Sequence, residues 1–182
     1  MRTKKKVLAI CGSTRQSSSN LSIIKEIKEL FSDELDIHIF EGLAEIPHFN
    51  PDLDIDSPPR TVTDFRSQLK EAAGILICTP EYAMGVPGTL KNALDWTVSS
   101  MEFSHKPVAL ITASSMGEKG HESLLGTLLV IESDIPESSR LLISFVKTKI
   151  NKEGKFVDMA TLDQVKKVMG SLVSSMSARS NG

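Results

Sequence analysis

Residues 7–20, VLAICGSTRQSSSN, join a short apolar run to a glycine and a cluster of hydroxyl side chains. The run from Val7 to Cys11 is short and uninterrupted, which is typical of a strand buried on both faces of a parallel sheet. A helical pattern follows, with apolar residues at Leu21, Ile24 and Ile27. A buried strand, a polar loop and an amphipathic helix in this order indicate the first half of a βαβ unit.

The same alternation continues along the whole chain. Strands are expected over residues 7–11, 35–40, 75–78, 107–113 and 141–146, and helices over residues 21–31, 62–72, 87–101, 124–134 and 162–176. The strand at 35–40 alternates apolar and polar residues, so we expect it at an edge of the sheet. Capping-box patterns at residues 61–64 and 161–164 are expected to begin two of the helices. The chain therefore predicts an α/β fold, a three-layer sandwich around a five-stranded, parallel, doubly wound sheet.

Composition narrows the possible functions. The 182 residues are 40% hydrophobic and 24% charged, which predicts a single globular domain over residues 1–182. The net charge of -2 favours neither nucleic acid nor a membrane surface as a partner. Two cysteines exclude a disulfide framework and a four-cysteine zinc site, and we expect no metal. The apolar run before Cys11 is too short for a signal peptide, so a cytoplasmic location is expected.

The loop after the first strand predicts a phosphate site. Ligands of doubly wound sheets bind outside the carboxyl ends of the strands, and this loop also precedes a helix, whose free N–H groups favour an anion. Five hydroxyl groups and the guanidinium of Arg15 crowd the turn between Gly12 and Asn20. The alternative is that Ser18, Ser19 and Asn20 only cap the helix, but capping does not need Arg15.

Two later loops have compatible chemistry. Residues 79–88, TPEYAMGVPG, follow the strand at 75–78, and Tyr82 and Met84 offer an aromatic ring and a sulfur to a planar ligand. An ordinary rigid turn is the alternative interpretation. Residues 114–120, SSMGEKG, follow the strand at 107–113, and their small side chains allow a ligand to approach the backbone.

Together these segments resemble the NAD(P)H-dependent FMN reductase family, flavodoxin-like proteins that include quinone, chromate and azo-dye reductases. The family's first loop matches here at Gly12, Ser13, Arg15, Ser18 and Asn20. Its second motif matches at residues 80–82, PEY, and at residues 87–96, PGTLKNALDW. The similarity is close over about residues 7–120. One departure is Ala83, because the family has an asparagine at this position.

The resemblance implies a set of cofactor contacts. The first loop would hold the FMN phosphate, residues 80–84 would line the isoalloxazine ring and the ribityl chain, and residues 114–117 would flank the pyrimidine edge of the ring. No side chain is expected to act as a catalytic acid or base, because the flavin carries the hydride. The expected cofactor-binding residues are Ser13, Arg15, Ser18, Ser19, Asn20, Pro80, Glu81, Tyr82, Ala83, Met84, Ser114, Ser115, Met116 and Gly117.

The resemblance also implies a function and an assembly. The expected protein is an FMN-containing oxidoreductase that uses NADPH or NADH to reduce a small acceptor, namely free flavin, a quinone, an azo compound or a metal oxyanion. It would form a homodimer or homotetramer through the helix that contains Asn92, Asp95 and Trp96. Two alternatives stay open at this point: a flavodoxin-type electron carrier, and a non-catalytic flavin-binding or sensor protein.

Overall fold

The computed structural model describes residues 4–180 and contains a five-stranded parallel sheet. Its spatial order is β2-β1-β3-β4-β5, so the edge position expected for the second strand is confirmed. The strands are β1 (Lys5–Cys11), β2 (Leu35–Ile39), β3 (Gly74–Thr79), β4 (Val108–Ala113) and β5 (Arg140–Ile143). The helices are α1 (Ser19–Leu30), α2 (Arg60–Glu71), α3 (Gly88–Asp95), α4 (Glu118–Val130) and α5 (Met159–Ser180).

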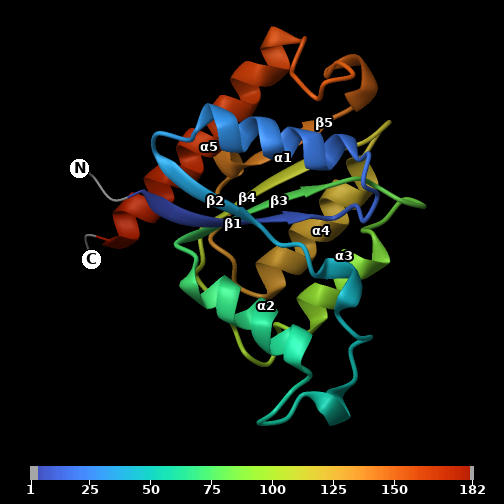
Figure 1. The fold of residues 1–182 in the computed structure, drawn as a ribbon, viewed down its shortest axis with the longest axis vertical. Helices are drawn as coiled ribbons and strands as arrows, with labels where there is room; N and C mark the ends of the chain where they lie inside the picture. Colours follow the sequence, from blue (N-terminus) through green and yellow to red (C-terminus); the bar gives the residue numbers. More distant parts are fainter. Residues whose placement is uncertain (1–3, 181–182) are drawn as a thin grey trace.

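Helices cover both faces of the sheet, which confirms the three-layer, flavodoxin-like sandwich. Helices α1 and α5 lie on one side, and α2, α3 and α4 lie on the other (Figure 1). Alternate residues of β1 divide between the two cores: Val7 and Ala9 pack toward α1 and α5, and Leu8 and Ile10 pack toward α2–α4. Burial on both faces explains why this strand is a continuous apolar run. No helix within residues 4–180 is long and apolar enough to cross a membrane.

Four of the five helices differ from their expected boundaries. Helix α4 spans Glu118–Val130 rather than residues 124–134. Helix α3 ends at Asp95 rather than near residue 101, and Val98 and Met101 beyond it are exposed. Helix α2 begins after Pro59 with no side-chain cap, so residues 61–64 are not a capping box. Helix α5 begins at Met159, and its cap is Asp158, whose Oδ1 accepts a hydrogen bond from the N–H of Thr161 at 2.8 Å.

Hydrogen bonding explains the acidity of this cap. Hydrogen bonds from the side chain and backbone of Thr161, together with Lys149, lower the pKa of Asp158 to about 2. The cap therefore stabilises the start of α5 at pH values above the ordinary carboxyl pKa, and this contribution is lost as the pH falls through about 2.

The long loop over residues 41–59 is fastened to the segment around α3. The indole Nε1 of Trp96 donates to the carbonyl of Pro47 at 2.8 Å. The rings of Trp96 and Phe49 pack nearly perpendicular to each other, with their centroids 5.1 Å apart. The side chain of Asn92 accepts from the N–H of Phe49 at 2.7 Å and donates to the carbonyl of Pro47 at 3.0 Å. Trp96 is 0% exposed within the chain. Asn92 and Trp96 therefore hold the long loop within the chain, and the expected assembly through this helix stays a prediction.

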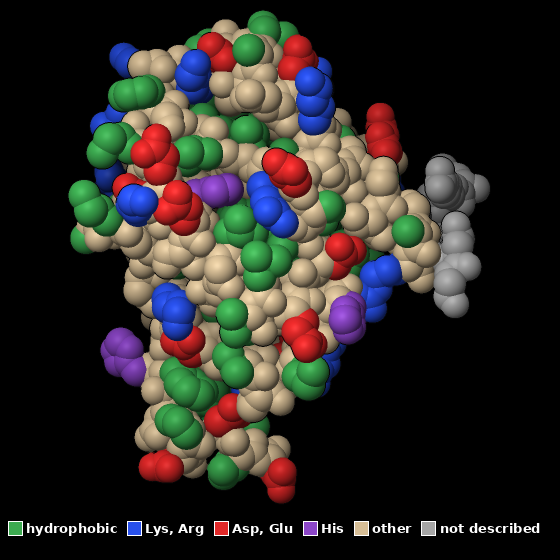
Figure 2. Space-filling view, turned by 180° about the vertical axis from the view of Figure 1, so that it is seen from behind, with side chains coloured by type: hydrophobic (Ala, Val, Ile, Leu, Met, Phe, Trp, Pro, Cys, Tyr) green, Lys and Arg blue, Asp and Glu red, His purple; other side chains and the backbone are tan. Residues whose placement is uncertain are grey.

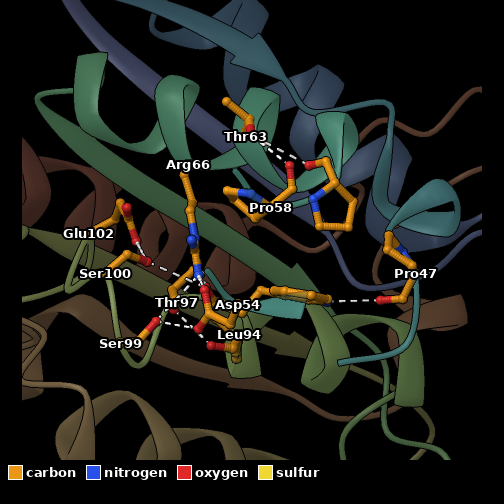
Figure 3. A network of polar contacts seen from close by, with 12 residues as sticks. Pro47, Asp54, Pro58, Thr63, Arg66, Leu94, Thr97, Ser99, Ser100 and Glu102 are labelled. Atoms are coloured by element: carbon orange, nitrogen blue, oxygen red, sulfur yellow. Dashed lines mark hydrogen bonds and ion pairs between the residues drawn. The ribbon is translucent and has the colours of Figure 1, made fainter. Parts of the chain in front are cut away.

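A buried ion pair secures the far end of the same loop (Figure 3). Arg66 Nη2 donates to Asp54 Oδ1 at 2.8 Å, and Arg66 Nε donates to the carbonyl of Trp96 at 2.8 Å. The hydroxyl of Ser99 donates to the second oxygen of Asp54. Burial alone would raise the pKa of Asp54, but the hydrogen bonds from Ser99 and Arg66 outweigh it and hold this pKa below its ordinary value. The pair therefore stabilises the fold near neutral pH and loses its effect in acid.

Replacing Asp54 with alanine is expected to loosen this loop, because Arg66 would stay buried without its carboxylate partner. We expect the free energy of unfolding in urea at pH 7 to fall by about 2 kcal/mol. Proteolytic cleavage within residues 41–59 should also become faster. Asp52→Ala is the matched control, because Asp52 is exposed in the same loop and its carboxylate has no partner among residues 4–180. Equal stability of the two variants would contradict a locking role for the pair.

Candidate functional site

A cleft of about 450 Å³ opens where the strands end. This volume lies within the range of roughly 300–1,000 Å³ that is typical of small-molecule sites. The loops after β1, β3, β4 and β5 all contribute to the cleft, which is the expected place for a ligand in a doubly wound sheet. The lining residues are Ser13, Arg15, Ser17, Ser18, Ser19, Asn20, Pro80, Tyr82, Ala113, Ser114, Ser115, Phe145, Val146, Lys147 and Thr148.

The ends of β1 and β3 approach each other closely, directly before the cleft residues Ser13 and Pro80. The N–H of Gly12 donates to the carbonyl of Cys78 at 2.9 Å. A Cβ atom at Gly12 would lie 2.1 Å from Thr79 Oγ1, so a side chain cannot be accommodated there without displacing β3. The glycine therefore lets the chain turn directly from β1 into the loop that leads to α1.

The hydroxyl cluster lies at the start of α1, as the sequence indicates. Ser18 is the cap of this helix, and its Oγ accepts from the N–H of Asn20 at 3.2 Å. Ser17 and Ser19 also line the cleft, and the guanidinium of Arg15 has no hydrogen-bond or ion-pair partner in the described part of the chain. Capping therefore accounts for Ser18 alone, whereas Arg15 and the neighbouring hydroxyls stay available to an anion.

Asn20 has a different role in this geometry. Its side chain is 3% exposed, its Nδ2 donates to the carbonyl of Ala113 at 3.1 Å, and its Oδ1 accepts from the thiol of Cys78 at 3.3 Å. Burial raises the pKa of the Cys78 thiol, so this thiol stays protonated and can donate. The amide of Asn20 thus ties the start of α1 to the ends of β3 and β4.

The loop after β3 contains a tight turn over Tyr82–Gly85. The N–H of Tyr82 donates to the carbonyl of Gly85 at 3.1 Å, and the N–H of Gly85 donates back at 3.0 Å. Ala83 and Met84 have φ values of +49° and +60°, the pattern of a type I′ turn, which favours asparagine and glycine. The Tyr82 hydroxyl lies 3.5 Å from Ser13 Oγ, so this turn reaches the loop after β1.

The Glu81 carboxylate is bound within the protein. Its Oε2 accepts from the N–H of Gly120 at 2.7 Å, in the first turn of α4, where a negative charge is favourable. A Cβ at Gly120 would lie 3.1 Å from the Glu81 side chain, so the glycine permits this contact. The carboxylate therefore joins the β3 loop to α4 and is not among the groups that line the cleft.

Nine of the fourteen expected site residues line this cleft, and five do not. Those outside its lining are Glu81, Ala83, Met84, Met116 and Gly117. The segment Phe145–Thr148 lines the cleft but is not expected from the sequence, because the apolar run 141–146 indicates a strand throughout. The strand in fact ends at Ile143, and the chain turns at Phe145, whose φ is +52°. A signal was present in Lys147 and Thr148, polar residues directly after an apolar run.

The charged side chains that line the cleft are all positive. Arg15 and Lys147 are its two charged lining residues, and no aspartate or glutamate is among the rest. The chain as a whole has slightly more acidic than basic residues, with 23 against 21. The cleft is therefore suited to an anionic ligand. In residues 4–180 no group of three or more His, Cys, Asp and Glu side chains is placed to hold a metal ion.

Ala83→Asn is expected to stabilise the turn over Tyr82–Gly85. An L-alanine with positive φ costs about 1 kcal/mol, and asparagine tolerates this conformation better. We expect the free energy of unfolding to rise by about 0.5–1 kcal/mol, measured in urea. Ala83→Val is the matched variant, and it should lower stability because a β-branched residue is strained at positive φ. The turn assignment is wrong if the valine variant is as stable as the asparagine variant.

Comparison with known proteins identifies the family. The family model for NADPH-dependent FMN reductases matches residues 5–133. A quinone reductase of Escherichia coli is 29% identical over 173 residues, 91% of this chain and 92% of the relative. An NAD(P)H-dependent FMN reductase of Pseudomonas aeruginosa is 32% identical over 159 residues, 84% of this chain and 85% of the relative.

A solved structure supports the same assignment. FerB of Paracoccus denitrificans, a flavoenzyme described as an NAD(P)H:(acceptor) oxidoreductase, superimposes with a TM-score of 0.81 at 25% identity. The match covers 96% of this chain and 98% of FerB. The family match extends over most of the chain and includes the loops after β1, β3 and β4. The chain therefore belongs to the NADPH-dependent FMN reductase family of oxidoreductases.

Proposed function

We propose that this protein binds FMN in the cleft at the carboxyl end of the sheet and uses NADPH or NADH to reduce a small acceptor. The observation that carries the proposal is a cleft with two cations, a cluster of hydroxyl groups and no carboxylate, in a chain of this family. The names of the relatives favour a quinone or a flavin as the acceptor. An azo compound and a metal oxyanion are the further candidates, and we propose that the reaction takes place in the cytoplasm.

The chemistry of the cleft fits both ends of FMN. The N–H groups at the start of α1, the hydroxyls of Ser17 and Ser19 and the guanidinium of Arg15 are suitable donors for a phosphate. The half-exposed ring of Tyr82, beside Pro80, offers an apolar surface for a planar ring system. A phosphate site and an aromatic surface in one cleft match a flavin mononucleotide better than an isolated anion.

In this proposal the protein's own residues bind FMN and fix its orientation. Bound FMN would supply the transfer of hydride and electrons, which is chemistry that the side chains lack. Arg15 would hold the phosphate, Asn20 would keep the start of α1 in place, and the turn at Tyr82–Gly85 would fix the aromatic wall. No side chain of the cleft lining is a carboxylate or a histidine, so we assign no acid or base to the protein.

The purified protein is expected to take up FMN with one site per chain and to lose its visible flavin absorbance when NADPH or NADH is added without oxygen. Reoxidation by an added quinone should then restore the absorbance. A flavin that stays oxidised with both nicotinamides would favour the electron carrier. A protein that reduces its flavin but passes electrons to no small acceptor would favour a sensor. Failure to take up FMN would overturn the proposal.

We propose that the protein is a homodimer or homotetramer that associates through the surface beside α3, with side chains other than Trp96. Val98 and Met101, which follow α3, are 57% and 59% exposed. Phe49, Leu53 and Ile55 of the long loop add further exposed apolar area. Figure 2 shows hydrophobic side chains gathered toward the lower end of the molecule, where Figure 1 places this loop. Apolar side chains that cluster on a surface are typical of a protein interface.

Val98→Asp is expected to lower the molar mass measured by light scattering, because a buried, unpaired carboxylate would disfavour association. Val157→Asp is the control, since Val157 is similarly exposed, at 56%, but precedes α5. A monomeric wild-type protein, or the same mass for wild type and Val98→Asp, would argue against this surface.

A further inference from the structure

We propose that the segment Phe145–Thr148, after β5, is a fourth cofactor-binding loop. In this proposal Lys147 pairs with the FMN phosphate, and Phe145 contacts the flavin ring. The inference rests on the proposed function, because it assigns further residues to the same site. It goes beyond the motifs that mark the family, which lie in the loops after β1 and β3 and precede residue 97, and beyond the family match, which ends at residue 133.

The segment is held rigidly against a wall of the cleft. The N–H of Phe145 donates to the carbonyl of Ser115 at 3.0 Å, and the N–H of Val146 donates to the carbonyl of Ser114 at 3.1 Å. The hydroxyl of Ser144 donates to the carbonyl of Met116 at 2.9 Å. Three hydrogen bonds therefore join the loops after β4 and β5 into one wall, and a ligand that contacts Ser114 and Ser115 lies beside this segment.

Phe145 adopts an unfavourable conformation that the surrounding structure maintains. Its φ is +52°, which is rare for a bulky residue, and its side chain is 65% exposed. Its carbonyl accepts from both the N–H and the hydroxyl of Thr148, at 2.8 and 2.9 Å. Neither the strained backbone nor the exposed ring stabilises the folded chain. Strained residues that neighbouring contacts hold in place are concentrated at binding sites, and here the ring lines the cleft.

Among the described residues Lys147 is unpaired, as is the nearby Lys152, but of the two only Lys147 lines the cleft. Lys149 pairs with Asp158 at 3.1 Å, and Lys155 pairs with Glu26 at 2.5 Å. Lys147 lines the cleft and has no carboxylate partner within residues 4–180. Arg15 has none either, and it approaches the cleft from the loop after β1. Two unpaired cations from separate loops line one cleft together with several hydroxyl groups, and this combination of groups suits a doubly charged anion.

A comparison of FMN with riboflavin distinguishes the Lys147–phosphate contact from the Phe145–ring contact, because riboflavin has the ring and the ribityl chain but no phosphate. The dissociation constants of both flavins are measured by fluorescence for the full-length wild type, Lys147→Gln and Phe145→Gly. Lys147→Gln should weaken FMN binding about fivefold to tenfold and leave riboflavin binding unchanged. Phe145→Gly should weaken the binding of both flavins about equally, by roughly threefold to tenfold.

Thermal unfolding of the flavin-free variants provides a second readout. Phe145→Gly should raise the melting temperature while it lowers flavin affinity, because glycine relieves the positive φ. His105→Gly is the control for this effect, since His105 is exposed with a φ of +56° at the opposite end of the sheet. It should leave both flavin affinities unchanged. Lys152→Gln is the control for charge, because Lys152 is exposed but does not line the cleft.

The outcomes separate the two proposals. Wild-type protein that binds neither flavin would overturn the proposed function, and this inference with it. Wild-type protein that binds FMN, with affinities unchanged in both Lys147→Gln and Phe145→Gly, would overturn the inference alone. Equal losses of FMN and riboflavin affinity in Lys147→Gln would also overturn the phosphate contact. If Lys152→Gln weakened FMN binding by the same factor as Lys147→Gln, the effect would come from the overall charge of the protein and not from a contact of Lys147 with the phosphate.

Discussion

The buried amide of Asn20 is the contact on which the geometry of the cleft depends. A parallel sheet brings the ends of its strands to one edge, but the loops that follow are separate segments with no covalent link between them. Asn20 donates to the carbonyl of Ala113 at the end of β4 and accepts from Cys78 in β3. Both partners are buried, so water does not compete for either hydrogen bond. The start of α1 is thereby held at a set position beside two other strands.

Other motif residues also act by holding the loops in place. Glu81 binds the first turn of α4, and Asn92 and Trp96 hold the long loop over residues 41–59. Outside the motifs, the backbone N–H of Phe145 donates to the carbonyl of Ser115 and holds the loop after β5. A cofactor needs its contacts within a fraction of an ångström, so residues that fix a loop matter as much as residues that touch a ligand. In this account the second family motif mainly shapes the cleft and its surroundings.

The fold and the centre of the site could be predicted from local patterns. Buried strands such as β1 are continuous apolar runs, and Ser18 and Arg15 lie in a turn that only a strand–loop–helix unit explains. What could not be predicted depends on contacts between distant segments. The helical pattern around Trp96 does not reveal that Pro47 and Phe49, from a distant loop, cover its ring. Phe145 belongs to an apolar run that is typical of a strand. The run does not reveal that β5 pairs with β4 only as far as Ile143. Residues 61–64 look like a capping box, but Pro59 already begins α2.

We propose that four loops at one edge of the sheet form a single FMN site. This proposal can be tested by recording the amide chemical shifts of the isotope-labelled protein as FMN is added. We expect the shifts of residues 13–20, 82–85, 114–117 and 145–148 to move together, at one FMN per chain. Residues lining the hollow beside β2, such as Asp36 and His38, should stay unchanged. Shifts confined to that hollow, or spectra that FMN does not alter, would contradict the account.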